Sequence, residues 1–292
     1  MKKVLFIAAL IGITTSGMAQ KAYNLQFKPK QGEKYDAITN TKSSIKQSMM
    51  GQEMVIDMNY DVNMLYEVVK AAENTSLNMT YDKLEMDMSM MGQNIKMSSD
   101  DPDNSNDANK PFKALKGGKI SVIVSPDGKV VDIQGAEDLA NRIGDASPAE
   151  KETLKAFVSK DNLRSMTEQS FGLFPGKPVK IGDSWKKAMT IESPYKLTSD
   201  NTYKLIKVEN GLAYIDVNGI VSTGGAQKMT ANGMEMTVEL TGDQQGTMSI
   251  DEATGIIKEF NVAQNLKGKM EVMGQEVPME IKSDTNTKMV KK

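Results

Sequence analysis

Methionine is the residue type whose spacing could do chemistry in this chain. Met86, Met88 and Met90 alternate along one segment, and Met234 and Met236 repeat the spacing. Thioether sulfurs are soft ligands, and clusters of them bind Cu(I). Methionine is also unbranched and polarizable, so it packs well in cores and against varied apolar ligands. Three hypotheses follow: ordinary core, the lining of a cavity for a lipid-like ligand, and a copper site.

Nucleophilic catalysis is disfavoured by what the chain lacks. Ser184 follows Gly182 and Asp183, an arrangement comparable to the nucleophile block of serine esterases. That chemistry needs a base, normally histidine, and the sequence contains no histidine. The sequence also has no cysteine, which excludes thiol chemistry, disulfides and most zinc sites. A carboxylate-based hydrolase stays as an alternative, although no pair of acidic residues is singled out. We predict a non-enzyme with no catalytic residue, metal or cofactor.

An acidic segment, residues 99–109, begins like a calcium loop. However, Asn106 stands where an EF-hand loop requires glycine, and Phe112 stands where it requires glutamate. We therefore predict a solvated loop.

Alternation of apolar and polar residues marks the elements that must position the methionines. Residues 53–69 are apolar at every second position, which is typical of a β-strand with one buried face. A second such segment starts at Leu77 and changes phase near Asp82 and Lys83, which predicts a β-bulge there. The two segments would form a long, curved hairpin whose apolar face excludes Glu85 and Asp87. The candidate cavity-lining residues are Met54, Ile56, Met58, Met86, Met88, Met90, Met234 and Met236.

Three Met-Gly-Gln triplets, at residues 50–52, 91–93 and 273–275, each join two alternating segments, as Asn232-Gly233 does less closely. Glycine adopts positive φ without steric cost, so we interpret them as strand reversals.

Two halves of the sequence share an ordered set of turns. Residues 30–35 and 180–185 both read Lys-x-Gly-acid-x-aromatic, and residues 70–74 and 207–211 follow at corresponding places. Residues 124–130 are then matched by residues 250–256. The pattern predicts a tandem duplication, with Trp185 buried as an anchor of the second half.

The region between the halves is predicted to be helical. Residues 135–143 could form a short helix with Leu139 on its apolar face. Ser147-Pro148-Ala149-Glu150 combines an N-cap serine, proline at the first helical position and a capping-box glutamate. Leu154, Phe157 and Val158 would mark the apolar face of that helix, with a continuation from Asp161.

The first 19 residues have the features of an export signal. Lys2 and Lys3 precede an apolar run, and Gly17-Met18-Ala19 fits a small-x-small cleavage site. Cleavage near Ala19 would leave a soluble protein in the periplasm or outside the cell. No later apolar run approaches the roughly 20 residues that a transmembrane helix needs. The chain has a net charge of −2 and no basic tract, which argues against a nucleic-acid partner.

Several of these segments together resemble a known family. They are the signal sequence, Gly32-Glu33-Lys34-Tyr35, residues 98–101, residues 125–130 and residues 174–185. This set looks like a family of uncharacterised secreted proteins of Gram-negative bacteria, filed as a domain of unknown function. Its most specific part is the Pro-Val-Lys-x-Gly-Asp-Ser-Trp block. The resemblance implies an exported, β-rich protein and no known activity. A looser likeness is to periplasmic lipoprotein carriers, whose open barrel holds acyl chains.

The sequence thus predicts an α+β protein, mainly antiparallel β, with long curved sheets or an open barrel. We expect a signal peptide (1–19), an N-terminal β half (20–134), a helical insert (135–173) and a C-terminal β half (174–292). The predicted function is non-catalytic binding of an apolar, lipid-like ligand or of a protein partner of unknown identity. The alternatives are the carboxylate-based hydrolase and the methionine-rich Cu(I)-binding protein.

Overall fold

The computed structural model describes residues 21–49, 51–103, 105–142, 158–192, 195–231 and 234–292. The predicted signal peptide and the predicted helix start at Ser147 lie outside the described residues, as does the Asn232-Gly233 reversal.

About 63% of the described residues are in strands and 11% are helical. The first strands are β1 (Lys34–Met49), β2 (Gln52–Ala71), β3 (Thr75–Met90), β4 (Gln93–Ser98), β5 (Lys119–Val124) and β6 (Val130–Gln134). The later strands are β7 (Ser184–Ile191), β8 (Leu197–Glu209), β9 (Leu212–Ser222), β10 (Gln227–Ala231), β11 (Met234–Asp251), β12 (Ile257–Val272) and β13 (Gln275–Lys291). The helical elements are η1 (Asp107–Asn109), α1 (Lys110–Leu115), α2 (Ala136–Arg142) and α4 (Lys160–Phe171).

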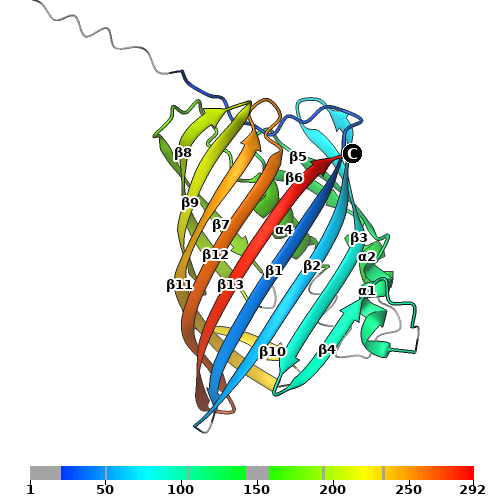
Figure 1. Cartoon of the computed structure of the whole chain (residues 1–292), viewed down its shortest axis with the longest axis vertical. Coiled ribbons are helices and arrows are strands. Elements are labelled where there is room, and N and C mark those ends of the chain that lie inside the picture. Colours follow the sequence, from blue (N-terminus) through cyan, green and yellow to red (C-terminus); the bar gives the residue numbers. More distant parts are fainter. Residues whose placement is uncertain (1–20, 50, 104, 143–157, 193–194, 232–233) are drawn as a thin grey trace, which may run out of the picture.

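All of these strands belong to one antiparallel sheet that does not close. Its order is β6-β5-β3-β2-β1-β13-β12-β11-β9-β8-β7, with β4 paired to β3 and β10 to β11. The sheet curls so far that both edge strands, β6 and β7, contact α4, which lies behind β1 and β13 in Figure 1. The prediction of an antiparallel, β-rich α+β fold with long curved sheets is confirmed.

The long methionine-rich hairpin is present as β2 and β3. Asn63 pairs with Lys83 and the next residue, Met64, pairs with Tyr81, so Asp82 is an extra residue in β3. This bulge keeps the apolar side chains of both halves of β3 on one face of the sheet. The predicted phase change is therefore a bulge, as expected.

Tight reversals stand at two of the Met-Gly-Gln triplets. Met91 and Gly92 have φ of 51° and 79° between β3 and β4, and Met273 and Gly274 have 51° and 78° between β12 and β13. Two successive residues at positive φ are typical of the turn that matches strand twist in a hairpin.

The strand order of the first half recurs in the second. The run β6-β5-β3-β2-β1 corresponds to β12-β11-β9-β8-β7, and β13 lies between the two runs. Tyr35 pairs with Tyr66 at the start of β1, and Trp185 pairs with Tyr203 at the start of β7. The turns before them make equivalent backbone hydrogen bonds. The Gly32 amide donates to the Val68 carbonyl at 2.9 Å, and the Gly182 amide donates to the Leu205 carbonyl at 2.7 Å.

The helices between these runs cover one end of the sheet. Helix α2 buries Leu139, as the sequence predicts. Helix α4 begins after Ser159, whose hydroxyl accepts a hydrogen bond from the Asn162 amide, and it buries Leu163 and Phe171.

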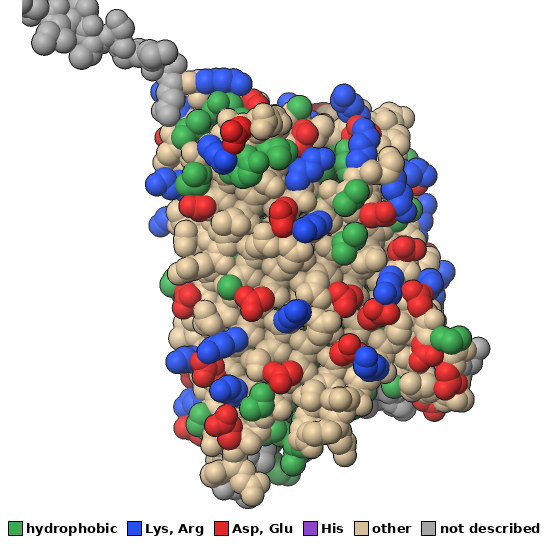
Figure 2. All heavy atoms as spheres, viewed as in Figure 1, with side chains coloured by type: hydrophobic (Ala, Val, Ile, Leu, Met, Phe, Trp, Pro, Cys, Tyr) green, Lys and Arg blue, Asp and Glu red, His purple; other side chains and the backbone are tan. Residues whose placement is uncertain are grey.

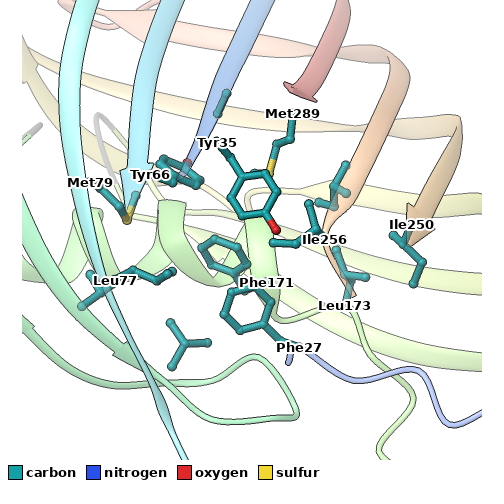
Figure 3. Close-up of a cluster of buried hydrophobic side chains, with 14 of the residues drawn as sticks. Phe27, Tyr35, Tyr66, Leu77, Met79, Phe171, Leu173, Ile250, Ile256 and Met289 are labelled. Atoms are coloured by element: carbon teal, nitrogen blue, oxygen red, sulfur yellow. The ribbon is translucent and has the colours of Figure 1, made fainter. Parts of the chain in front are cut away.

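An aromatic cluster fills the end of the curl that α4 covers (Figure 3). The Phe171 ring lies 4.5 Å from the Phe27 ring and 5.9 Å from the Tyr66 ring, centroid to centroid. The Phe27 amide donates to the Pro126 carbonyl at 3.0 Å, and the Lys28 amide donates to the Thr254 carbonyl at 2.8 Å. The segment before β1 therefore ties together corresponding turns of the two halves.

Candidate functional site

The two faces of the sheet differ in chemistry. Tyr35, Ala37, Met64 and Tyr66 are buried against the helices, so the alternate positions of β1 and β2 define the inward, concave face. The outward face carries ion pairs between neighbouring strands, such as Lys34 with Glu67 at 3.1 Å. Figure 2 shows this face, where charged groups are scattered among uncharged polar side chains and backbone and apolar side chains are sparse at mid-height.

Six of the eight predicted cavity residues lie together on the inward face. Met58 pairs with Met88, and Ile56 pairs with Met90. Met54 and Met86 extend the same face along β2 and β3. All six are half-buried, so none is an ordinary core residue. Glu85 and Asp87 point to the opposite face, as alternation requires.

The remaining two predicted residues are elsewhere. Met234 and Met236 are on β11, which β1, β13 and β12 separate from β2. Met236 is half-buried and pairs with Val272 and Met229, whereas the Met234 side chain is outside the described part of the structure. The sequence could not place them, because the strand order is set by long-range pairing.

Tyr60 belongs to the same apolar wall. Its hydroxyl donates to the Met58 sulfur at 3.3 Å, and Met86 is its partner on β3. Burial raises the pKa of the Tyr60 phenol, so it stays a neutral donor at physiological pH. We call Met58, Tyr60, Met86 and Met88 the methionine wall.

A polar group lies beside the methionine wall on the neighbouring strands β1 and β13, and it was not predicted from the sequence. Three hydroxyl pairs join β1 to β13: Thr39 with Thr287, Thr41 with Thr285, and Ser43 with Ser283, at 3.0, 3.0 and 2.8 Å. The only sequence signal was serine or threonine at alternate positions of both segments. Because these residues alternate with other polar residues, the segments show little apolar–polar alternation.

An amide chain continues the polar group toward β8. The Gln264 amide nitrogen on β12 donates to the Gln244 carbonyl at 2.7 Å. Gln244 in turn donates to Asn201 and to Ser199, which lie on β8 beyond β9. Gln244 and Asn201 are buried at 6% and 2% exposure, and Gln264 is half-buried. We call Ser43, Ser283, Gln264, Gln244 and Asn201 the polar belt.

The methionine wall and the polar belt meet in one cross-strand row. In pairing order the row runs Met88, Met58, Ser43, Ser283, Gln264, Gln244, Gly219, Asn201 and Lys187. Its β3–β2 end is apolar, its middle is polar and uncharged, and its one charged residue is Lys187 on edge strand β7. A face of this kind can hold an amphipathic molecule.

Two grooves lie near this row. One, of about 530 Å³, is lined mainly by outward residues such as Lys42, Asp57 and Asp87, so it lies chiefly on the outward face. The other, of about 900 Å³, lies between α4 and β7, and its lining includes Arg164, Glu168 and Lys187.

The remaining sequence candidates fall outside this site. Ser184 is exposed at the start of β7, whereas Trp185 is buried at 7% exposure and its indole N–H donates to the Leu173 carbonyl at 2.7 Å. In the acidic loop the Asn109 amide donates to Asp101 at 2.7 Å and the Ser105 hydroxyl donates to Asp103 at 2.7 Å. Within the described ranges no three His, Cys, Asp or Glu residues gather as metal ligands would.

The fold defines a class of protein built on an open, strongly curved antiparallel sheet, in which helix α4 contacts both edge strands. The chain belongs to a family of unknown function, DUF6263, which it matches over residues 72–257. Comparison with curated proteins gives no match. Among the described residues, no helix is long and apolar enough to cross a membrane.

Solved structures align with this chain at low identity. Lipovitellin, in a structure described by its lipid–protein interactions, aligns at 12% identity and a TM-score of 0.50 over 89% of this chain. The aligned part is 25% of the lipovitellin chain, so this protein spans a quarter of that length. OpdQ of Pseudomonas aeruginosa aligns at 7% identity and a TM-score of 0.24, over 90% of this chain and 100% of its own.

Proposed function

We propose that this protein is a non-catalytic carrier that holds a lipid-like ligand against the inward face of its sheet. The observation that carries the proposal is the single cross-strand row in which half-buried Met58 and Met88 adjoin uncharged Ser43 and Ser283. An acyl chain on the wall would gain roughly 25 cal/mol for each Å² of apolar surface removed from water.

The composition of the wall favours a flexible apolar ligand. Methionine side chains change rotamer easily and tolerate ligands of different shape. The lipovitellin structure, which concerns lipid–protein interactions, supports the same class of ligand on a related fold. Export, as expected from the first 19 residues, would place the carrier in the periplasm or outside the cell.

The first experiment identifies ligands retained from the natural source. Native mass spectrometry of the protein purified from its own cells should show an added mass that organic extraction releases as lipid. If extraction releases no bound mass and a fluorescent fatty-acid probe does not bind, the carrier function is ruled out.

A second experiment places the ligand on the wall. Met58→Asp and Met88→Asp put a charge on the apolar side and should weaken probe binding at least tenfold. The matched controls are Asp57→Asn and Asp87→Asn, which change adjacent outward residues and should leave binding unchanged. Circular dichroism of each variant separates lost binding from lost fold. Equal effects of wall and control variants would show that the probe binds elsewhere.

A further inference from the structure

We propose that the polar end of the ligand is an uncharged, hydroxyl-bearing head, as in a monoacylglycerol, and that Gln264, Ser43 and Ser283 bind it. This inference rests on the proposed carrier function and names the ligand class for that same site.

The first step is position. Ser43 pairs directly with Met58, Ser283 pairs with Ser43, and Gln264 pairs with Ser283. Neighbouring strands are about 4.8 Å apart, so the step from Met58 to Gln264 spans about 14 Å along the sheet. A single amphipathic molecule can therefore lay its chain on the methionine wall and reach the three polar side chains with its head.

The second step is hydrogen-bonding capacity. The Gln264 amide nitrogen donates to Gln244, but within the described part of the chain no residue donates to the Gln264 carbonyl oxygen. The Ser43 and Ser283 hydroxyls bond each other at 2.8 Å, which uses one of their two protons. The site thus offers one acceptor, the Gln264 carbonyl oxygen, and one donor, the remaining hydroxyl proton of the Ser43–Ser283 pair, side by side. A ligand hydroxyl, which both donates and accepts, satisfies both.

The third step is charge. Lys187 is the one charged residue of the row, and it lies on β7, four strands beyond Gln264 in the sheet order β12-β11-β9-β8-β7. A carboxylate or phosphate held at Gln264 would be partly desolvated with no cation in its row, which is costly. A neutral hydroxyl avoids that cost, so the belt selects against an anionic head.

The test compares two ligands that differ only in the head. A monoacylglycerol and the fatty acid with the same acyl chain are titrated at pH 7 against the fluorescent probe. We expect the monoacylglycerol to compete at least about tenfold better. Gln264→Leu and Ser43→Ala should each reduce monoacylglycerol affinity several-fold more than fatty-acid affinity. The control is Asn265→Leu, at the adjacent outward position.

The outcomes separate the two proposals. Equal or tighter binding of the fatty acid, or equal loss of both ligands in Gln264→Leu, overturns the neutral-head inference and leaves the carrier function standing. Failure of both ligands to displace the probe, with a folded protein, overturns the carrier function itself. Ser43→Ala removes one hydroxyl without adding bulk, so it provides a readout if Gln264→Leu does not fold.

Discussion

Gln244 on β11 donates a hydrogen bond to Asn201 on β8, although β9 lies between the two strands. The residue of β9 in that row is Gly219. A Cβ atom there would lie 2.1 Å from the Asn201 Oδ1 atom and 2.9 Å from the Asp200 carbonyl oxygen. The missing side chain is what allows the buried amides to meet, so the polar belt depends on a glycine.

Gly219→Ala should therefore destabilise the fold by about 1–3 kcal/mol, because the new methyl displaces a buried hydrogen-bonded amide. Urea unfolding measures the loss. Adding Asn201→Ala to Gly219→Ala removes the side chain that clashes, so the double variant should lose less than the sum of the two single changes. Strict additivity would mean that Gly219 acts independently of Asn201.

Trp185 should anchor the second half of the sheet. It is buried, stacks on Tyr203 at 5.7 Å between ring centroids and donates to the Leu173 carbonyl. Trp185→Ala should cost about 3–5 kcal/mol in unfolding free energy. Trp185→Phe keeps most of the packing and should cost less, since it loses mainly the hydrogen bond. The native protein should show blue-shifted tryptophan fluorescence, and a water-like emission maximum would contradict the anchor role.

Acid should destabilise the protein through Glu33. Desolvation alone would raise the pKa of its carboxyl, but hydrogen bonds from Lys291, Tyr35 and the Lys30 amide outweigh it and lower the pKa to about 2. A depressed folded-state pKa means that the stabilisation is complete above the ordinary value of 4.5 and is lost as pH falls toward 2.

Over that range the unfolding free energy should fall by about 1–3 kcal/mol. This is less than the full pKa shift would give, because water screens a carboxylate near the surface. Glu33→Gln should remove this part of the pH dependence, as measured by urea midpoints at pH 7, 4.5 and 2.5. Glu53→Gln, in an exposed ion pair with Lys46, is the control and should leave the profile unchanged. Parallel profiles for wild type and Glu33→Gln would show that other groups control acid stability.

Gly128 should tolerate no side chain. It has φ of 85°, and a Cβ atom would lie 1.6 Å from the Phe171 carbonyl oxygen at the end of α4. Gly128→Ala should cost more than about 3 kcal/mol, since both the backbone conformation and the helix position must change. Gly117→Ala is the matched control, because Gly117 also has positive φ but nothing within 4 Å, and should cost about 1 kcal/mol. Similar melting temperatures for the two variants would contradict the contact.

Leucine replacement distinguishes an apolar wall from a copper site. The triple change of Met86, Met88 and Met90 to leucine keeps apolar volume and removes the sulfurs. Binding of the fatty-acid probe should stay within about threefold of wild type, since such swaps are well tolerated. The copper hypothesis would be supported instead if the parent protein binds little probe and the triple variant keeps its fold but loses Cu(I) binding.

The alternation of apolar and polar residues predicted those parts of the fold that depend on residues close together in the sequence. The alternation in β2, the bulge at Asp82 and the reversal at Met91 all follow from neighbours in sequence. The polar belt does not, because Ser43 and Ser283 meet only through the pairing of β1 with β13, 240 residues apart. Polar residues on both faces of β1 leave its register unspecified by hydrophobic pattern. Sequence reasoning therefore placed the methionines of β2 and β3 on one face but did not predict the polar residues beside them.

The place of β13 has a consequence for the order of assembly. β13 follows both repeated runs in the chain, yet it lies between β1 and β12 in the sheet. Until residues 275–291 join the sheet, β1 and β12 are two unpaired edges. Joining them closes a loop of more than 200 residues, which is entropically slow. During folding, both edges therefore stay open to edge-to-edge association until β13 is in place.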